Sequence, residues 1–286
     1  MKYIDMHVHS TYSDGAESVE NLIKKAKENN VDFLSITDHD IIIPSNEILS
    51  ESNIVIVKGI ELSTKYNFLN QNIYIHLLGY DYDSNNKELN EELSRMKEVL
   101  KRGYIETLDK ISCKKIDVPS YIKEQVDLNN YMLIDEQIRR LLIKNNYSFS
   151  RAQDIAKEIQ KYNSEYPSYE IDIKKAIKLI IDSGGIAIIA HPNKIKISKQ
   201  NIFKLIASLK KIGLVGIESC HSSFTKDDFI FYKEIAKKLN LLESVGSDFH
   251  YEEENQGIVI GHGIDNNICS ESCSAKELIM RRKNNG

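Results

Sequence analysis

The chain has 286 residues, 41% of them hydrophobic and 28% charged, and this composition is typical of a folded globular protein rather than a disordered one. Its 38 basic and 42 acidic residues give a net charge of −4, so no overall basic field indicates nucleic acid or an anionic membrane as a partner. No apolar run approaches the roughly 20 residues of a membrane span, and Lys2, Asp5 and His7 interrupt any secretory signal, so we expect a cytoplasmic protein without membrane contact.

Short runs rich in β-branched residues recur along the chain, with helical patterns between them. Between the first two runs, the apolar residues from Val19 to Ala26 keep to one face of a helix. This alternation predicts a parallel sheet covered by helices. The seven predicted strands are YIDMHVH (3–9), DFLSITDHD (32–40), NIVIVKGIEL (53–62), NIYIHLLGY (72–80), GGIAIIAHP (184–192), GLVGIES (213–219) and LLESVGSDFH (241–250).

Strand candidates vanish from about Ser84 to Glu170, where helical patterns such as KELNEELSRMKEVLKRGYIETLDKI (87–111) and DEQIRRLLIKNNYS (135–148) take over. The alternation resumes with a helix predicted over about 172–182. We therefore expect an inserted helical subdomain within one α/β domain. The predicted limits are 1–84 for the first part of that domain, 85–170 for the insertion and 171–286 for the second part.

Histidines and carboxylates stand at or near the C-terminal end of nearly every predicted strand. Active sites are built at that end in parallel α/β proteins, because the loops there converge. His7 and His9 are two residues apart, so a strand that continues to His9 presents both side chains from one face, and Asp248 and His250 repeat this spacing. The candidate ligands are His7, His9, Asp14, His39, Glu61, His76, His191, Asp248 and His250.

Each candidate alone fits an ordinary structural role, such as a Ser-Asp-Gly turn at Asp14 or a salt bridge at Glu61. Together they indicate bound cations, because crowding so many imidazoles and carboxylates is costly without compensating charge. Nine groups exceed the needs of one ion and predict two or three, and a nitrogen and oxygen ligand set suits Zn, Mn or Fe. The four cysteines are too few and scattered for a disulfide framework, and we expect Cys269 and Cys273 to be reduced thiols.

The motifs DMHVHSTYSDG, ITDHD, KGIEL, IHLLGYDYD, IAHP and GSDFH, in this order between residues 5 and 250, resemble the PHP (polymerase and histidinol phosphatase) family. The IHLLGYDYD stretch, followed by a helical insert, SGGIAIIAHP and GIES, further resembles the subgroup of metal-dependent phosphoesterases that act on small nucleotides. The resemblance implies a distorted (β/α)7 barrel with an inserted helical cap subdomain and a trinuclear metal centre.

The same resemblance implies a role for each ligand candidate. Glu61 would bridge two ions. Asp38 and Asp40 would orient an imidazole or cap the following segment. A hydroxide between two ions would attack the phosphorus. Glu61 and Asp248 would thus stand at the catalytic centre of a hydrolase that cleaves a phosphate monoester of a small nucleotide or phosphorylated metabolite. The implied groups are His7, His9, Glu61 and Asp248 for the first ion, Glu61, His76 and His191 for the second, and Asp14, His39 and His250 for the third.

The insert departs from the subgroup pattern. The stretch IDEQIRR (134–140) stands where the family has Gly-Arg-Pro-His, so Asp135 and Gln137 replace a family arginine and histidine. Arg140 matches a later family arginine. The candidate substrate contacts are Arg139, Arg140, Lys194 and His221, with a solvated helix face as an equal alternative for the two arginines. His221 is also the candidate that protonates the leaving group.

Two further functions remain open. An exonuclease on short RNA or DNA ends needs positive charge leading to the metals, for which the sequence offers only the lysines of residues 194–211. A catalytically inactive structural or regulatory metal-binding module belongs to another class, and the full set of ligand candidates argues against it. The expected partner is a small phosphorylated substrate, and the sequence indicates no oligomeric state.

Overall fold

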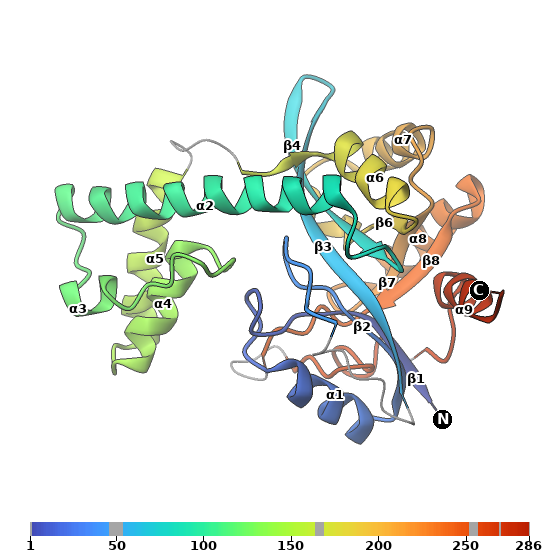
Figure 1. Ribbon diagram of the computed structural model, residues 1–286, viewed down its shortest axis with the longest axis horizontal. Coiled ribbons are helices and arrows are strands. Elements are labelled where there is room, and N and C mark those ends of the chain that lie inside the picture. Colours follow the sequence, from blue (N-terminus) through green and yellow to red (C-terminus); the bar gives the residue numbers. More distant parts are fainter. Residues whose placement is uncertain (1, 46–53, 164–168, 252–256, 269, 286) are drawn as a thin grey trace. The chain divides into compact units, whose positions relative to one another are not determined.

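The computed structural model of the chain describes residues 2–45, 54–163, 169–251, 257–268 and 270–285. The chain divides into two compact units (Figure 1). One, here called the barrel unit, comprises Met1–Asn90 and Glu170–Gly286; the other, the helical unit, comprises Glu91–Tyr169. The predicted limits 1–84, 85–170 and 171–286 stay a prediction.

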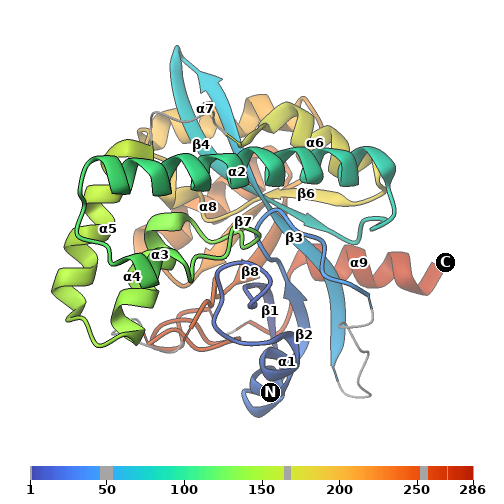
Figure 2. The ribbon, with the colours of Figure 1, turned by 60° about the vertical axis from the view of Figure 1, so that its left-hand side comes forward.

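The described strands of the barrel unit form one sheet, which curls into a nearly closed barrel (Figure 2). Val8, at the end of the first strand, forms a parallel bridge with Phe249, just beyond the last strand, and this contact nearly closes the sheet. The predicted α/β barrel is confirmed. The order along the sheet is β1 (Tyr3–Val8), β2 (Val31–Ile36), β3 (Val55–Phe68), β4 (Gln71–Tyr80), β6 (Ile186–Ile189), β7 (Gly216–His221) and β8 (Leu242–Gly246), with the short β5 (Ile171–Asp172) beside β3.

Strand β4 departs from the predicted parallel arrangement. It pairs antiparallel with both β3 and β6, whereas the pairs β1–β2, β2–β3, β6–β7 and β7–β8 are parallel. Leu69 and Asn70 join β3 to β4 with φ of 52° and 62°, the positive values that a two-residue hairpin turn requires. A parallel connection needs a dozen or more residues, so this short turn makes the prediction of a wholly parallel sheet wrong at β4.

Helices cover the outside of the sheet, and polar caps start several of them. Ser18 accepts the N–H of Asn21 at the start of the first helix, and Thr225 forms a reciprocal capping box with Asp228. No helix in the described ranges is long and apolar enough to cross a membrane. The described helices of this unit are α1 (Val19–Glu28), α6 (Ile173–Asp182), the 3-10 turn η1 (Pro192–Lys194), α7 (Lys199–Lys210), α8 (Lys226–Leu239) and α9 (Ser274–Asn285).

Two apolar clusters hold the barrel unit together. One packs α1 against the sheet, with Leu22 and Ala26 of the helix against Leu34 of β2. The other contains Met6 of β1 and Leu78 of β4, both fully buried. The histidines and carboxylates of the strands belong to neither of these two apolar clusters.

The helical unit has its own apolar core and contains no strand among its described residues. Ile134, Ile138 and Leu142 recur every four residues along one helix and are all buried in this core, so the helix is amphipathic. Its helices are α2 (Lys87–Cys113), most of which belongs to this unit, α3 (Ser120–Lys123), α4 (Ile134–Lys144) and α5 (Phe149–Asn163).

Candidate metal centre

Seven of the eight histidines of the chain form one cluster in the barrel unit. The ring of each lies with its centroid 4.1 to 5.5 Å from that of another member. The structure brings together all nine candidate ligands. They come from β1 and the loop after it (His7, His9, Asp14), the segment after β2 (His39), β3 (Glu61), β4 (His76), the end of β6 (His191) and the segment after β8 (Asp248, His250).

Glu61 lies at the middle of this cluster and is completely buried. Its Oε1 is 3.0 Å from His76 Nδ1 and 2.9 Å from His191 Nε2. Its Oε2 faces a different set of imidazoles. The Oε2 distances are 3.2 Å to His7 Nε2, 3.1 Å to His9 Nε2 and 3.4 Å to His39 Nδ1. The two oxygens of one carboxylate therefore serve two groups of histidines.

A first group is formed by His7, His9, Glu61 and Asp248, each of which offers a donor atom within 4.8 Å of the others. Asp248 Oδ1 is 3.4 Å from His7 Nε2 and 3.3 Å from His9 Nε2. The two Nε2 atoms are themselves only 3.1 Å apart. Two imidazole nitrogens this close need a proton or a cation between them, because two lone pairs repel.

Another set of neighbouring donor atoms within the cluster belongs to His9, Asp14, His39 and His250. Asp14 Oδ2 is 3.2 Å from His250 Nε2, and Asp14 Oδ1 is 3.4 Å from His9 Nδ1. His9 therefore presents Nε2 to the first group and Nδ1 to Asp14, whereas the resemblance assigned it to one ion. His39 also faces two ways, because Nδ1 lies near Glu61 and Nε2 is 3.8 Å from Asp14 Oδ2.

Burial and charge give the histidines different protonation. Burial lowers the pKa of His39 to about 3, and burial together with Lys194 lowers the pKa of His191 to about 4. Both shifts favour the neutral ring, which has a lone pair to offer. At His9 burial works in the same direction, but the carboxylates of Asp248 and Glu61 outweigh it and raise the pKa to about 10.

The cluster has the donor atoms that a divalent metal ion takes. Glu61 Oε2 and His39 Nδ1 are buried and have no hydrogen-bond partner among the described residues. Such unpaired buried atoms cost about 1–3 kcal/mol each unless something binds them. A set of imidazole nitrogens and carboxylate oxygens within 4.8 Å fits divalent cations, and the predicted dependence on divalent metal is supported in this coarse form.

Asp38 and Asp40 hold the backbone around the cluster. Asp38 accepts the N–H of Ser10 at 2.8 Å and the hydroxyl of Ser13 at 2.5 Å, so it positions the loop that carries Asp14. Asp40 accepts the N–H of Ser63 at 2.7 Å. These bonds run to backbone N–H groups and serine hydroxyls rather than to an imidazole, and the expected role of the two carboxylates in orienting an imidazole or capping the following segment stays a prediction.

Lys194 and His221 both contact Asp248. Lys194 Nζ is 2.6 Å from Asp248 Oδ2, with half of the lysine side chain exposed, and His221 Nε2 is 3.3 Å from the same oxygen. The N–H of Ser223 donates to His221 Nδ1, so Nε2 carries a proton that points at Asp248. Burial works to lower the pKa of Lys194, but Asp248 and Glu61 raise it, so the ammonium is retained.

Arg139 and Arg140 lie on α4 of the helical unit. Arg139 donates two bonds of 2.7 Å to the carboxylate of Glu136 and is nearly buried, and Arg140 donates to the same carboxylate at 2.8 Å. Asp135 and Gln137 are buried in this unit too. Gln137 donates to the carbonyl of Met132 at 2.9 Å, which explains an amide at this position. Substrate contact by the two arginines stays a prediction.

A carboxylate that the sequence analysis missed, Glu218 of β7, is also part of the cluster. Its donor atoms lie within 4.8 Å of those of His7 and His221. The only signal in the sequence is a charged residue inside the otherwise apolar run GLVGIES, where a parallel strand is expected to be buried on both faces.

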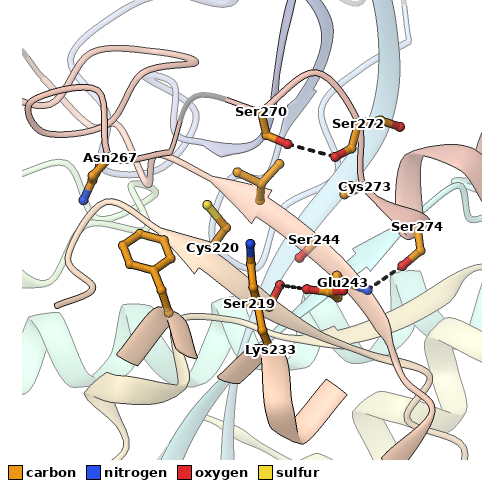
Figure 3. Close-up of a pocket in the computed structure, with 12 residues that line it drawn as sticks. Ser219, Cys220, Lys233, Glu243, Ser244, Asn267, Ser270, Ser272, Cys273 and Ser274 are labelled. Atoms are coloured by element: carbon orange, nitrogen blue, oxygen red, sulfur yellow. Dashed lines mark hydrogen bonds between the residues drawn. The ribbon is translucent and has the colours of Figure 1, made fainter. Parts of the chain in front are cut away.

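A separate cavity of about 280 Å³ lies against β7 and β8 and contains none of the candidate ligands (Figure 3). Among its polar side chains Ser219 donates to Glu243 at 2.6 Å, whereas the buried Ser244 Oγ has no hydrogen-bond partner among the described residues. Two free thiols line it, and burial raises the pKa of Cys220 to about 12 and that of Cys273 to about 11. Cys269 lies outside the described residues.

The nearly closed barrel and its histidine and carboxylate cluster define a PHP domain. The chain belongs to this family, because the PHP domain model matches residues 5–191. A solved amidohydrolase from Chromobacterium violaceum with bound sulfate shares the fold, with a TM-score of 0.77 and 23% identity over 98% of this chain and 96% of that one.

Two characterised relatives act on phosphate esters. A 5'-3' exoribonuclease from Haemophilus influenzae is 31% identical over 254 residues, which is 87% of this chain and 90% of the relative. A 3',5'-nucleoside bisphosphate phosphatase from Chromobacterium violaceum is 26% identical over 277 residues, 93% of each chain. The predicted enzyme class, a hydrolase of phosphate ester bonds, is confirmed, and the alternative of an inactive module is not supported.

Proposed function

We propose that the chain hydrolyses a phosphate monoester of a small nucleotide or phosphorylated metabolite with two or three divalent ions, of Zn, Mn or Fe. The position of Glu61 carries this proposal. Its Oε1 faces His76 and His191 at 3.0 and 2.9 Å, and its Oε2 faces the histidines of the first group. A buried carboxylate shared in this way is suited to join two ions.

These contacts support the three groups of ligands that the family resemblance implies. When bound, the ions supply a nucleophile from water near neutral pH and positive charge for the phosphoryl oxygens. The proposed groups are His7, His9, Glu61 and Asp248 for the first ion, Glu61, His76 and His191 for the second, and Asp14, His39 and His250 for the third.

Lys194 is the proposed phosphate contact of the barrel unit. Its ammonium is retained beside Asp248, and its half-exposed side chain can reach a phosphate oxygen as a point charge. His221 is 1% exposed, and its Nε2–H donates to Asp248 Oδ2. That bond holds Asp248 Oδ1 toward the first group, so we assign His221 to positioning Asp248. Its role as leaving-group acid stays a prediction.

Release of inorganic phosphate from a panel of nucleotides and sugar phosphates, with Mn or Zn added, tests the proposal. Asp248→Ala removes the carboxylate that faces both His7 and His9, and we expect it to abolish activity. Glu243→Ala removes a carboxylate of β8 outside the cluster and serves as the matched control. Full activity of purified Asp248→Ala contradicts the assignment.

Removal of nucleotides from RNA ends is the second candidate, because the H. influenzae relative bears that name. The barrel unit offers Lys194 beside the cluster, but the positive charge needed along a strand of RNA would have to come from further lysines, such as those of α7. A direct comparison decides: the rate on a 3',5'-nucleoside bisphosphate is measured against that on a short oligoribonucleotide at equal concentration. We expect the bisphosphate to be preferred, and a preference for the oligonucleotide favours the exoribonuclease.

A further inference from the structure

Glu218 touches two members of the cluster, and the proposed chemistry does not use it. It lies in β7 with its side chain completely buried. Its Oε1 is 3.1 Å from His7 Nδ1, and its Oε2 accepts the backbone N–H of His191 at 2.6 Å. One carboxylate therefore joins β7 to β1 and to the end of β6.

The contact with Glu218 fixes the role of His7 Nδ1. An ionised carboxylate only accepts hydrogen bonds, so Nδ1 carries a proton and donates it to Glu218, which leaves Nε2 as the ring atom able to bind an ion. Nε2 is the atom that faces the first group, at 3.2 Å from Glu61 Oε2 and 3.4 Å from Asp248 Oδ1. Partners of this kind orient an imidazole and increase its basicity as a ligand.

The contact with His191 holds an unusual backbone conformation. His191 has φ of 21° and ψ of 65°, values rarely adopted by a residue with a side chain. Its N–H is fixed by Glu218, while its Nε2 is 2.9 Å from Glu61 Oε1. Glu218 thus also determines where a member of the second group lies.

A fourth metal site at His7, Glu218 and His221 is the competing explanation, because their donor atoms lie within 4.8 Å. The hydrogen bonds argue against it. His7 would have to give up the Nδ1 proton while Nε2 also served the first group, and Glu218 Oε2 already accepts the N–H of His191. His221 Nε2 is nearer to Asp248 Oδ2, at 3.3 Å, than to Glu218 Oε2, at 4.0 Å.

We propose that Glu218 is a positioning residue that couples the first and second metal groups by holding His7 and His191 with one carboxylate. The inference rests on the proposed metal centre. The third group, which contains neither His7 nor His191, serves as an internal reference. Loss of the Glu218 carboxylate weakens the first two ions together and leaves the third unchanged.

Glu218→Gln tests the coupling, because an amide has one acceptor oxygen and cannot accept from both His7 and His191. Chelator competition measures the affinity of each ion, and we expect two ions to bind about 10- to 100-fold more weakly. NMR of the metal-free protein reads the Nδ1–H of His7, which we expect to exchange slowly with water in the wild type, where Glu218 accepts it, and faster in the variant. Glu243→Gln, which alters a carboxylate of the neighbouring β8 paired with Ser219 (Figure 3), is the matched control with no expected change.

Unchanged affinities with unchanged exchange of the His7 Nδ1–H in Glu218→Gln overturn the positioning role. Loss of one ion out of four, with three unaffected, overturns it in favour of a direct ligand. Should Glu218→Gln fail to fold, Glu218→Asp keeps both acceptors on a shorter side chain, and the same two measurements are expected to show weakening of two ions. Because the Nδ1–H exchange is read without metal, it decides the inference even if no phosphatase activity is found.

Discussion

Gly246, at the end of β8, allows β8 and β1 to approach closely beside the metal cluster. A Cβ added here would lie 2.2 Å from His7 Cβ, 3.1 Å from His7 N and 2.7 Å from Glu218 Oε1. Two of these atoms belong to the body of β1 and cannot rotate away. In Gly246→Ala either the strands separate or Glu218 moves off His7.

Both responses can be given a magnitude. Inserting one carbon into a well-packed core costs about 1–3 kcal/mol, and loss of a hydrogen bond to a charged group costs about 1.5–3 kcal/mol. Because one response or the other occurs, we expect Gly246→Ala to lower the free energy of unfolding of the barrel unit by about 1–3 kcal/mol, against a total of about 5–15 kcal/mol for a typical protein.

Urea unfolding of the metal-free protein, followed by circular dichroism, measures this change. Gly103→Ala is the matched control, because Gly103 lies within α2 and an added Cβ would meet nothing within 4 Å. There alanine is expected to stabilise its helix by about 0.5–1 kcal/mol. An unchanged unfolding midpoint in Gly246→Ala refutes the reasoning, and so does a loss of stability as large in Gly103→Ala.

Three further predictions concern single side chains. Glu61→Gln puts an NH2 group in place of one carboxylate oxygen, so elemental analysis after dialysis is expected to find at least one ion fewer per chain than in the wild type; equal content contradicts a shared ligand. Lys194→Met should raise KM for the phosphorylated substrate about tenfold with little change in kcat, since it removes one half-exposed charge contact, and Lys233→Met should leave both unchanged. Burial raises the pKa of Cys220 to about 12, so its thiol stays protonated at pH 8 and should be alkylated much more slowly than the exposed Cys113, as mass spectrometry of the peptides can show; equal rates contradict this.

The strands and the candidate ligands could be predicted from the sequence because one physical rule places them. Buried strands appear in the sequence as apolar runs, so polar side chains at their ends are easily recognised. His7, His39 and His191 stand out in this way, and all three lie in the cluster. Which ion each of them holds stays a prediction.

The direction of β4 could not be predicted by the same rule. Apolar runs have the same composition in parallel and antiparallel strands, so direction depends on the turn. The turn here is Leu69–Asn70, which lacks the glycine that usually marks a two-residue hairpin. His76 therefore lies in the middle of an antiparallel strand, not at the end of a parallel one.

Hydrogen bonds between site residues that are distant in the sequence could not be predicted either. Glu218 is 211 residues from His7, and nothing in the run GIES indicates which side chain the carboxylate meets. That His9 uses both ring nitrogens could not be predicted for a similar reason. Its Nδ1 lies near Asp14 because the loop that carries Asp14 is held by a hydrogen bond to Asp38. Such contacts are properties of the folded chain rather than of any local pattern.

The closure of the barrel between Val8 and Phe249 has a consequence for the order of assembly. The residues that meet there lie about 240 positions apart in the chain, and the proposed first metal group would take His7 and His9 from one side of this seam and Asp248 from the other. Contacts between such distant segments form late, because the entropy of closing the intervening loop must be overcome first. A growing polypeptide that has not yet reached β8 lacks Asp248 and His250, so the complete cluster can take up its ions only near the end of synthesis.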